Sequence, residues 1–260
     1  MSESIPLPAR NIEPLHTRRL DAGATRNMKY LKEDHMRDAD SGEDTEESAY
    51  LLEARLAELR QHRAEVQDRN SVAYADLQLE ESRLLIRLEK MDEAWDAARA
   101  ALDTHIGHEN WQGAVEACDV LYAADRPGSL AALGQGIWLA VTFPIEPELT
   151  VAMLEHVVEE TPDESDGAAV AAVTAHYIAD LRTEGKQRDD LVFYTNNLLG
   201  TVARRHSQVQ SQEAYDYWVK KMELHDPQLF LPRLRNVVDV LVQDEWWFDR
   251  DALRERLPVN

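Results

Sequence analysis

Apolar residues recur every three or four positions from residue 48 to the end of the chain, and this spacing is typical of amphipathic helices. The clearest stretch runs from Val72 to His105, and we interpret it as two antiparallel helices joined near residues 89–91. The second helix carries one apolar stripe, made of Ala94, Trp95, Ala98, Ala101 and Leu102. Because most of these side chains are alanine, we expect a neighbouring helix to approach closely on this side.

The same stretch resembles a tetratricopeptide-type (TPR-like) helical hairpin. When the repeat is counted from Ala75, small residues occupy its eighth, twentieth and twenty-seventh positions. These residues are Ser82, Ala94 and Ala101. The repeat usually has Gly at its eighth position, and its closing Pro is replaced here by Ile106. The resemblance covers about one repeat, residues 72–105, and implies a helical-repeat protein that serves as an interaction platform.

Further apolar stripes of helical period follow, separated by short polar or proline-containing breaks. The helices predicted outside the central hairpin begin near Ser48, Trp111, Ser129, Pro147, Ala168, Leu191, Gln212 and Arg233. The first of them extends to about Arg69. Before the last, Asp226 is a candidate cap and Pro227 the first helical residue, but Pro232 is expected to delay the regular helix to near Arg233. A short closing helix is expected to contain Trp246, Arg250, Leu253 and Leu257.

No alternating apolar run bounded by turn residues appears, so the sequence predicts no pair of strands. The breaks between helices are short, which favours antiparallel neighbours. We therefore predict an all-α fold, an α-solenoid of antiparallel helical hairpins with about ten or eleven helices. Gly134 and Gly136 lie inside one helix, where a glycine costs about 1 kcal/mol. We interpret them as points of close packing against a neighbour, with a ligand-facing gap as the alternative.

The first 47 residues differ from the rest, because they show no apolar periodicity that could stabilise a fold. Residues 1–32 carry six basic and three acidic side chains, whereas residues 33–47 carry eight acidic and one basic. We predict a disordered arm over residues 1–47 and a helical-repeat domain over residues 48–260. An alternative role for the arm is to dock on a partner, in part through Arg18 and Arg19.

The chain of 260 residues has a formal net charge of −21, from 49 acidic and 28 basic side chains. This charge repels phosphate backbones, so nucleic acid is not an expected ligand. It favours a partner with a basic or mixed-charge surface, and it also suits a high-salt source. Cys118 is the only cysteine, which excludes an intrachain disulfide and favours a cytoplasmic location. No apolar run reaches the length of a membrane span.

Two histidine groups could support chemistry. His105 and His108 are three residues apart, a spacing that could direct both imidazoles toward one metal ion. His156, followed by Glu159, could act as a general base, although a packed histidine with one hydrogen bond is the simpler interpretation. Cys118 is expected to be a small core residue. No phosphate-binding loop, catalytic serine motif or zinc-binding cysteine pair occurs, so the sequence indicates no cofactor.

The sequence therefore favours a non-enzymatic scaffold, adaptor or assembly factor that binds a partner protein through a helical-repeat surface. The residues expected to contact the partner are Arg18, Arg19, Trp246 and Trp247. The alternative for the two tryptophans is that both cover the open end of the solenoid. The compact basic stretches 204–206 and 220–221 are expected to face solvent or to complement helix C-termini. Two alternatives stay open: an all-helical enzyme or metal protein that uses His105 with His108, or His156, and an acidic decoy or regulator of a basic protein. The oligomeric state stays open too.

Overall fold

A computed structural model describes residues 29–31 and 42–257, and every regular element within these ranges is an α-helix. The helices are α1 (Gly42–Glu65), α2 (Val72–Arg87), α3 (Met91–Gly107), α4 (Trp111–Ala123), α5 (Ser129–Thr142), α6 (Pro147–Glu160), α7 (Asp166–Arg182), α8 (Gly185–Ser207), α9 (Gln212–Lys221), α10 (Pro227–Val242) and α11 (Arg250–Arg254). The all-α class and the predicted number of helices are confirmed for this part of the chain. No described helix combines the length and the apolar character needed to cross a bilayer.

Four predicted helix ends were wrong: both ends of α1, the start of the closing helix, and the start of α8, which lies at Gly185 and not near Leu191. Helix α1 begins at Gly42 and ends at Glu65, so it enters the segment that was predicted to be a disordered arm. Helix α10 begins at Pro227, as predicted, but it continues through Pro232, which was expected to delay the regular helix to Arg233. Pro232 is exposed, so water can bind the carbonyl group that loses its intrahelical partner, and the helix continues. The closing helix starts at Arg250 and excludes Trp246.

The chain divides into two compact units. We call residues 42–153 together with 238–257 the hairpin unit, and residues 29–31 together with 154–237 the second unit. The boundaries between them fall inside α6 and α10. Each unit is therefore described separately.

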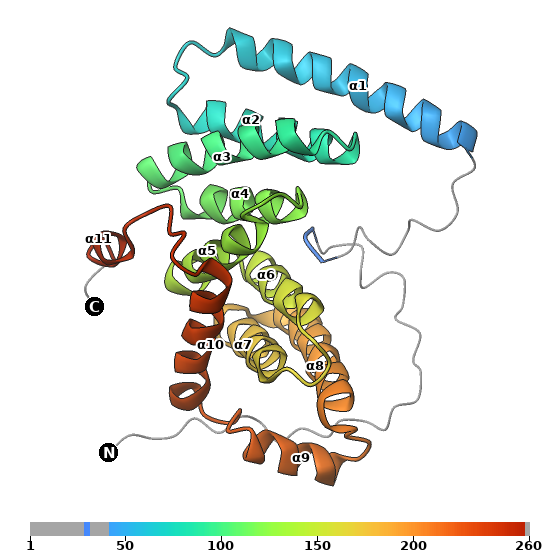
Figure 1. Ribbon diagram of the computed structural model, residues 1–260, viewed down its shortest axis with the longest axis vertical. Helices are drawn as coiled ribbons and strands as arrows, with labels where there is room; N and C mark the ends of the chain where they lie inside the picture. The colour runs from blue at the N-terminus through green and yellow to red at the C-terminus, as the bar shows by residue number, and fades with distance from the viewer. Residues whose placement is uncertain (1–28, 32–41, 258–260) are drawn as a thin grey trace. The chain divides into compact units, whose positions relative to one another are not determined.

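The hairpin unit is a series of helices in which each packs against the next along the chain (Figure 1). Helix α2 packs on α3, α3 on α4 and α4 on α5, while α2 also contacts α4 and α1 lies against α2. The three small residues of the TPR-like pattern are completely buried where these helices meet. They are Ser82, Ala94 and Ala101. The alanine stripe of α3 is thus the side on which its neighbours approach, as predicted.

Helix α5 is buried over almost its whole length, and its two glycines lie against other helices. A Cβ atom on Gly134 would lie 2.6 Å from Cγ2 of Val242, and one on Gly136 would lie 2.7 Å from Cβ of Cys118. Real Cβ atoms do not approach other atoms this closely. The prediction that these glycines permit close helix packing is confirmed.

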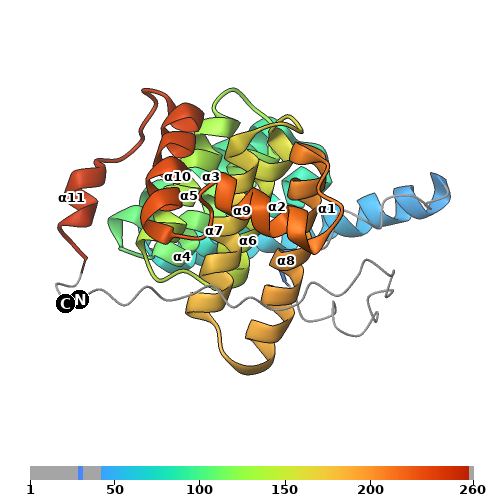
Figure 2. The same cartoon turned by 90° about the horizontal axis from the view of Figure 1, so that it is seen from below.

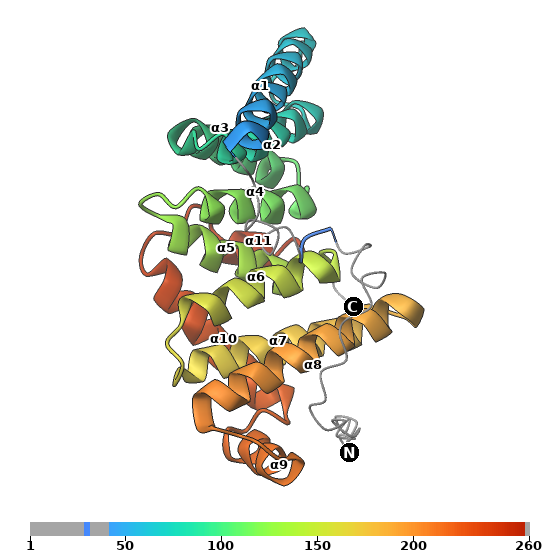
Figure 3. The ribbon, with the colours of Figure 1, turned by 90° about the vertical axis from the view of Figure 1, so that its right-hand side faces the viewer.

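In the second unit, α7 and α8 form an antiparallel pair, and α9 packs on the end of α8 (Figures 2 and 3). The guanidinium of Arg205 on α8 donates to the carbonyl of Val158 at 2.6 Å, in the last turn of α6. Arg233 donates in the same way to the carbonyl of Met222 at the end of α9. Arg205 therefore complements a helix C-terminus, as predicted for the basic stretch 204–206.

Candidate partner-binding site

Residues 245–257, which we call the C-terminal strap, follow α10 and lie along α3 and α5 of the hairpin unit. Its first part, Trp246 to Phe248, is not helical. Asp249 then caps α11, because its carboxylate accepts hydrogen bonds from the backbone N–H groups of Asp251 and Ala252 at 3.0 and 3.1 Å. This cap explains why the closing helix starts later than predicted.

The side chain of Gln135 on α5 binds main-chain atoms of the strap. This side chain is fully buried between the two glycines of that helix. Its Oε1 accepts a hydrogen bond from the backbone N–H of Trp247 at 2.8 Å, and its Nε2 donates to the carbonyl of Glu245 at 3.4 Å. A second proton of Nε2 is directed to the carbonyl of Ala131 at 3.2 Å. One carboxamide thus binds both a donor and an acceptor of the strap.

Trp247 is the first of the two tryptophans predicted to bind a partner, and it packs on α3. Its ring stands edge-on to Trp95, with centroids 6.1 Å apart, and the guanidinium of Arg99 lies 4.5 Å from its ring centroid. Gly128 makes room for both indoles, since a Cβ atom there would lie 3.3 Å from Trp95 and 3.8 Å from Trp247. Gly128 also has φ of +96°, a conformation that favours glycine.

Trp246, the second predicted tryptophan, packs on α5. Its ring centroid is 6.1 Å from that of the buried Trp138, and the guanidinium of Arg250 lies 3.9 Å from its own ring. Asp239 at the end of α10 fixes this guanidinium at 3.1 Å. Both predicted tryptophans are therefore half-buried against their own chain. Arg18 and Arg19 lie outside the described residues.

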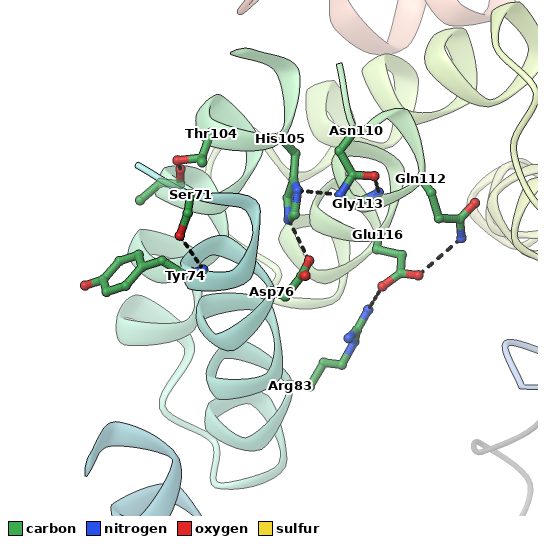
Figure 4. A network of polar contacts seen from close by, with 11 residues as sticks. Ser71, Tyr74, Asp76, Arg83, Thr104, His105, Asn110, Gln112, Gly113 and Glu116 are labelled. Atoms are coloured by element: carbon green, nitrogen blue, oxygen red, sulfur yellow. Dashed lines mark hydrogen bonds and ion pairs between the residues drawn. The ribbon is translucent and has the colours of Figure 1, made fainter. Parts of the chain in front are cut away.

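His105 and His108, for which a metal site was only an alternative to a polar helix end, have separate partners. In Figure 4, the ring of His105 lies between α2 and α4, with Asn110 on one side and Asp76 on the other. His108 instead directs its Nε2 to the backbone carbonyl of Asn70. Among the described residues, no group of three or more His, Cys, Asp and Glu side chains is arranged to hold a metal ion. His156 contacts Glu159 at 3.3 Å, in the second unit.

The hydrogen bonds of Asn110 determine how His105 is protonated. Its Oδ1 accepts the backbone N–H of Gly113 at 3.3 Å, so its amide group must be the part that faces Nδ1 of His105 at 3.0 Å. Nδ1 is then the acceptor, and the proton lies on Nε2, directed at Asp76 3.6 Å away. Burial lowers the pKa of His105, and the carboxylate of Asp76 opposes this shift. The neutral imidazole is a structural link between three helices.

A row of polar side chains, which we call the polar face, follows α2 and α4 (Figure 4). Arg83 of α2 donates to Glu116 of α4 at 2.6 Å. Gln112 donates to the same carboxylate at 3.2 Å and accepts the backbone N–H of Glu146 at 3.0 Å. The side chain of Arg83 is 39% exposed and that of Asp76 is 57% exposed, so this face is open to a partner.

Sequence reasoning missed Gln135 and the polar face. A glutamine between two glycines inside an apolar helix was a usable signal, because a buried carboxamide needs several polar partners. Arg83 and Glu116 gave no such signal, since each looks like an ordinary charge on the exposed side of a helix. Cys118 is fully buried and its pKa is raised by that burial, which agrees with a core role.

Comparisons with protein-family models, with curated proteins and with solved structures find no match.

Proposed function

We propose that this protein is a non-enzymatic scaffold, adaptor or assembly factor that binds a partner protein on the surface of its helical hairpins. The proposal includes a TPR-like, solenoid arrangement of the hairpins and a contribution from Arg18 and Arg19 of the N-terminal arm. The partner has a basic or mixed-charge surface. The cytoplasm is the proposed location, on the evidence of a single, buried cysteine.

The main observation behind the proposal is the polar face, which we take to be the surface that binds the partner. Its side chains come from two successive hairpins and are held by each other, so little side-chain freedom would be lost when a partner binds. Both signs of charge occur side by side, which suits a partner of mixed charge. The complete burial of Ser82, Ala94 and Ala101 supports the repeat resemblance, because these are the positions at which the repeat needs small residues.

The test uses the tagged full chain to capture proteins from the native source. A stoichiometric partner should be recovered, and Arg83→Glu should weaken capture roughly tenfold or more, because it places a second negative charge beside Glu116. Arg235→Glu is the matched control, since Arg235 is exposed on α10 and should not affect capture. A chain recovered alone, or equal capture by both variants, would contradict the proposal.

The acidic decoy is the second candidate, and the net charge of −21 favours it. The salt dependence of partner binding distinguishes the decoy from the scaffold. Binding through charge alone should collapse by about 0.2 M NaCl, where the Debye length is below about 8 Å. A scaffold with an apolar component to its interface should keep its partner at roughly 0.5 M NaCl. Replacing Arg18 and Arg19 by Glu in the full chain measures the part that the arm plays.

A further inference from the structure

The contact between Gln135 and the strap has the geometry of a peptide-binding site. Both hydrogen bonds reach main-chain atoms, the carbonyl of Glu245 and the N–H of Trp247, which any peptide of the same conformation also offers. Gln135 has no exposed surface, so its carboxamide depends on this bound segment for a partner on that side. Gly134 and Gly136 on either side of it let neighbouring helices enclose the site closely.

Aromatic side chains give the site its selectivity. Trp95 and Arg99 of α3 receive one indole, that of Trp247, through an edge-on contact and a guanidinium on the ring face. Trp138 of α5 receives the adjacent indole, that of Trp246, also edge-on. The site therefore fits two consecutive aromatic residues in a non-helical segment whose backbone is bound by one carboxamide.

We propose that this surface binds such a segment of the partner protein, and that residues 245–248 occupy it in its absence. The inference rests on the proposed function and names the chemistry by which the partner docks. The occupant is a separate protein and not a second copy of this chain. The strap of a second copy is identical, whereas the chain's own strap is held at an effective concentration in the millimolar range by its short connection to α10. A partner therefore has to offer a tighter version of the same motif.

The strap can leave without unfolding the helices. Trp246 and Trp247 both keep part of their surface in solvent, and residues 245–248 lie outside any helix. The connection to α10 is a turn in which Gln243 has φ of +52°. Segments outside regular secondary structure whose side chains stay partly exposed open at a lower free-energy cost than core helices do.

The experiment uses the full chain with Trp246→Ala and Trp247→Ala, which frees the site but leaves Gln135, Trp95 and Trp138 intact. The probe is a labelled synthetic peptide with the sequence of residues 243–250, blocked at both ends. Fluorescence anisotropy should show that the probe binds this variant roughly tenfold or more tightly than it binds the wild type, whose own strap competes. Adding Gln135→Leu to the variant should abolish that gain.

A control peptide with alanine at both tryptophan positions should not bind. The inference is overturned if the probe fails to bind a variant whose circular dichroism matches the wild type, or if Gln135→Leu leaves binding unchanged. Dimerisation of the wild type by exchange of straps at micromolar concentration would also overturn it. If the double variant does not fold, hydrogen exchange of the Trp247 amide in the wild type tests whether the strap opens by itself. The amide should exchange faster than those of α5, and exchange only through global unfolding would overturn the inference.

Failure here and failure of the proposed function are distinguishable. Capture of a partner that depends on Arg83, without binding of the probe, would overturn only the peptide site. Binding of the probe by a chain that captures no partner would overturn the scaffold proposal and leave the site in place.

Discussion

At the residue scale, Gly136 shows how one missing side chain can hold a helix in place. A Cβ atom there would lie 2.4 Å from Cε of Met153 and 2.7 Å from Cβ of Cys118. The methionine end can move aside, but the cysteine Cβ belongs to the well-packed helix α4. Overpacking of a core costs about 1–3 kcal/mol, whereas the better helix propensity of alanine returns only about 1 kcal/mol.

We therefore expect Gly136→Ala to lower the free energy of unfolding by about 1 kcal/mol, measured by chemical denaturation. Gly107→Ala is the control in the same unit, because Gly107 ends α3 and no heavy atom lies within 4 Å of the position of its Cβ. That control should be neutral or stabilising by up to about 1 kcal/mol. Equal effects of the two substitutions would show that the tight contact at Gly136 does not affect the free energy of unfolding.

The buried imidazole of His105 links stability to pH. Burial lowers its folded-state pKa below the ordinary value of about 6.5, so the unfolded chain takes up a proton more readily than the folded one. The stabilisation from neutral His105 is present above about pH 6.5 and is lost as the pH falls below it. Protonation of Nδ1 would also oppose the amide of Asn110, which caps α4.

His105→Gln should lower the free energy of unfolding by about 1–2 kcal/mol at pH 7.5, because a hydrogen bond and buried packing are lost. The difference between variant and wild type should shrink between pH 7 and pH 5. Denaturation curves at several pH values measure it, and the carboxylates, which titrate in both chains, cancel in the difference. A difference that stays constant with pH would mean that the pKa of His105 is the same in the folded and the unfolded chain.

At the scale of single elements, α1 is attached to its neighbours by a small apolar contact and a buried acid. Leu56 packs with Leu84 and Leu85 of α2. Glu81 of α2 is only 3% exposed and pairs with Arg60 at 2.7 Å and Arg63 at 3.0 Å. Removing the arginines would leave a buried carboxylate without compensation, whereas removing all three charges would not.

The variant with Arg60→Met and Arg63→Met should lose up to about 3 kcal/mol of α1 attachment, a value reduced by the partial exposure of both arginines. Adding Glu81→Met should restore about half of this loss or more. Hydrogen exchange of the α1 amides reports the attachment directly. The interpretation of Glu81 as a buried charge would be wrong if the triple variant exchanged as fast as the double variant.

The helices themselves could be predicted because their signals are local. Apolar spacing indicated all eleven described helices, although not all of their ends, and glycine inside an apolar helix indicated the close packing of α5. The environment of the strap could not be predicted in this way, because Gln135 and Trp247 are separated by 112 residues. The effect of Pro232 on α10 was predicted wrongly for a related reason. A proline ends a helix less readily where water can bind the carbonyl group that has lost its partner. The sequence alone does not show that Pro232 lies on the exposed side of α10.

At the scale of the whole molecule, the net charge of −21 means that like charges repel one another throughout the chain. Folding brings these charges closer together, so the repulsion lowers the stability of the folded state, and added salt should relieve it. Screening is effective once the Debye length is close to the spacing of surface charges, about 8 Å at 0.15 M salt. The sequence leaves two explanations for the acidity, a basic or mixed-charge partner and a high-salt source, and they differ in how far this relief extends.

If the acidity serves a partner, the free energy of unfolding should rise by about 1 kcal/mol between 0.02 and 0.2 M NaCl and change little beyond that. Chemical denaturation by urea, which adds no ions, measures this rise at each salt concentration. Potassium chloride should give the same curve, since screening depends on ionic strength and not on the cation. A rise that continues beyond about 1 M salt would instead connect the acidic surface to a high-salt source, and the charge would then no longer support a basic partner.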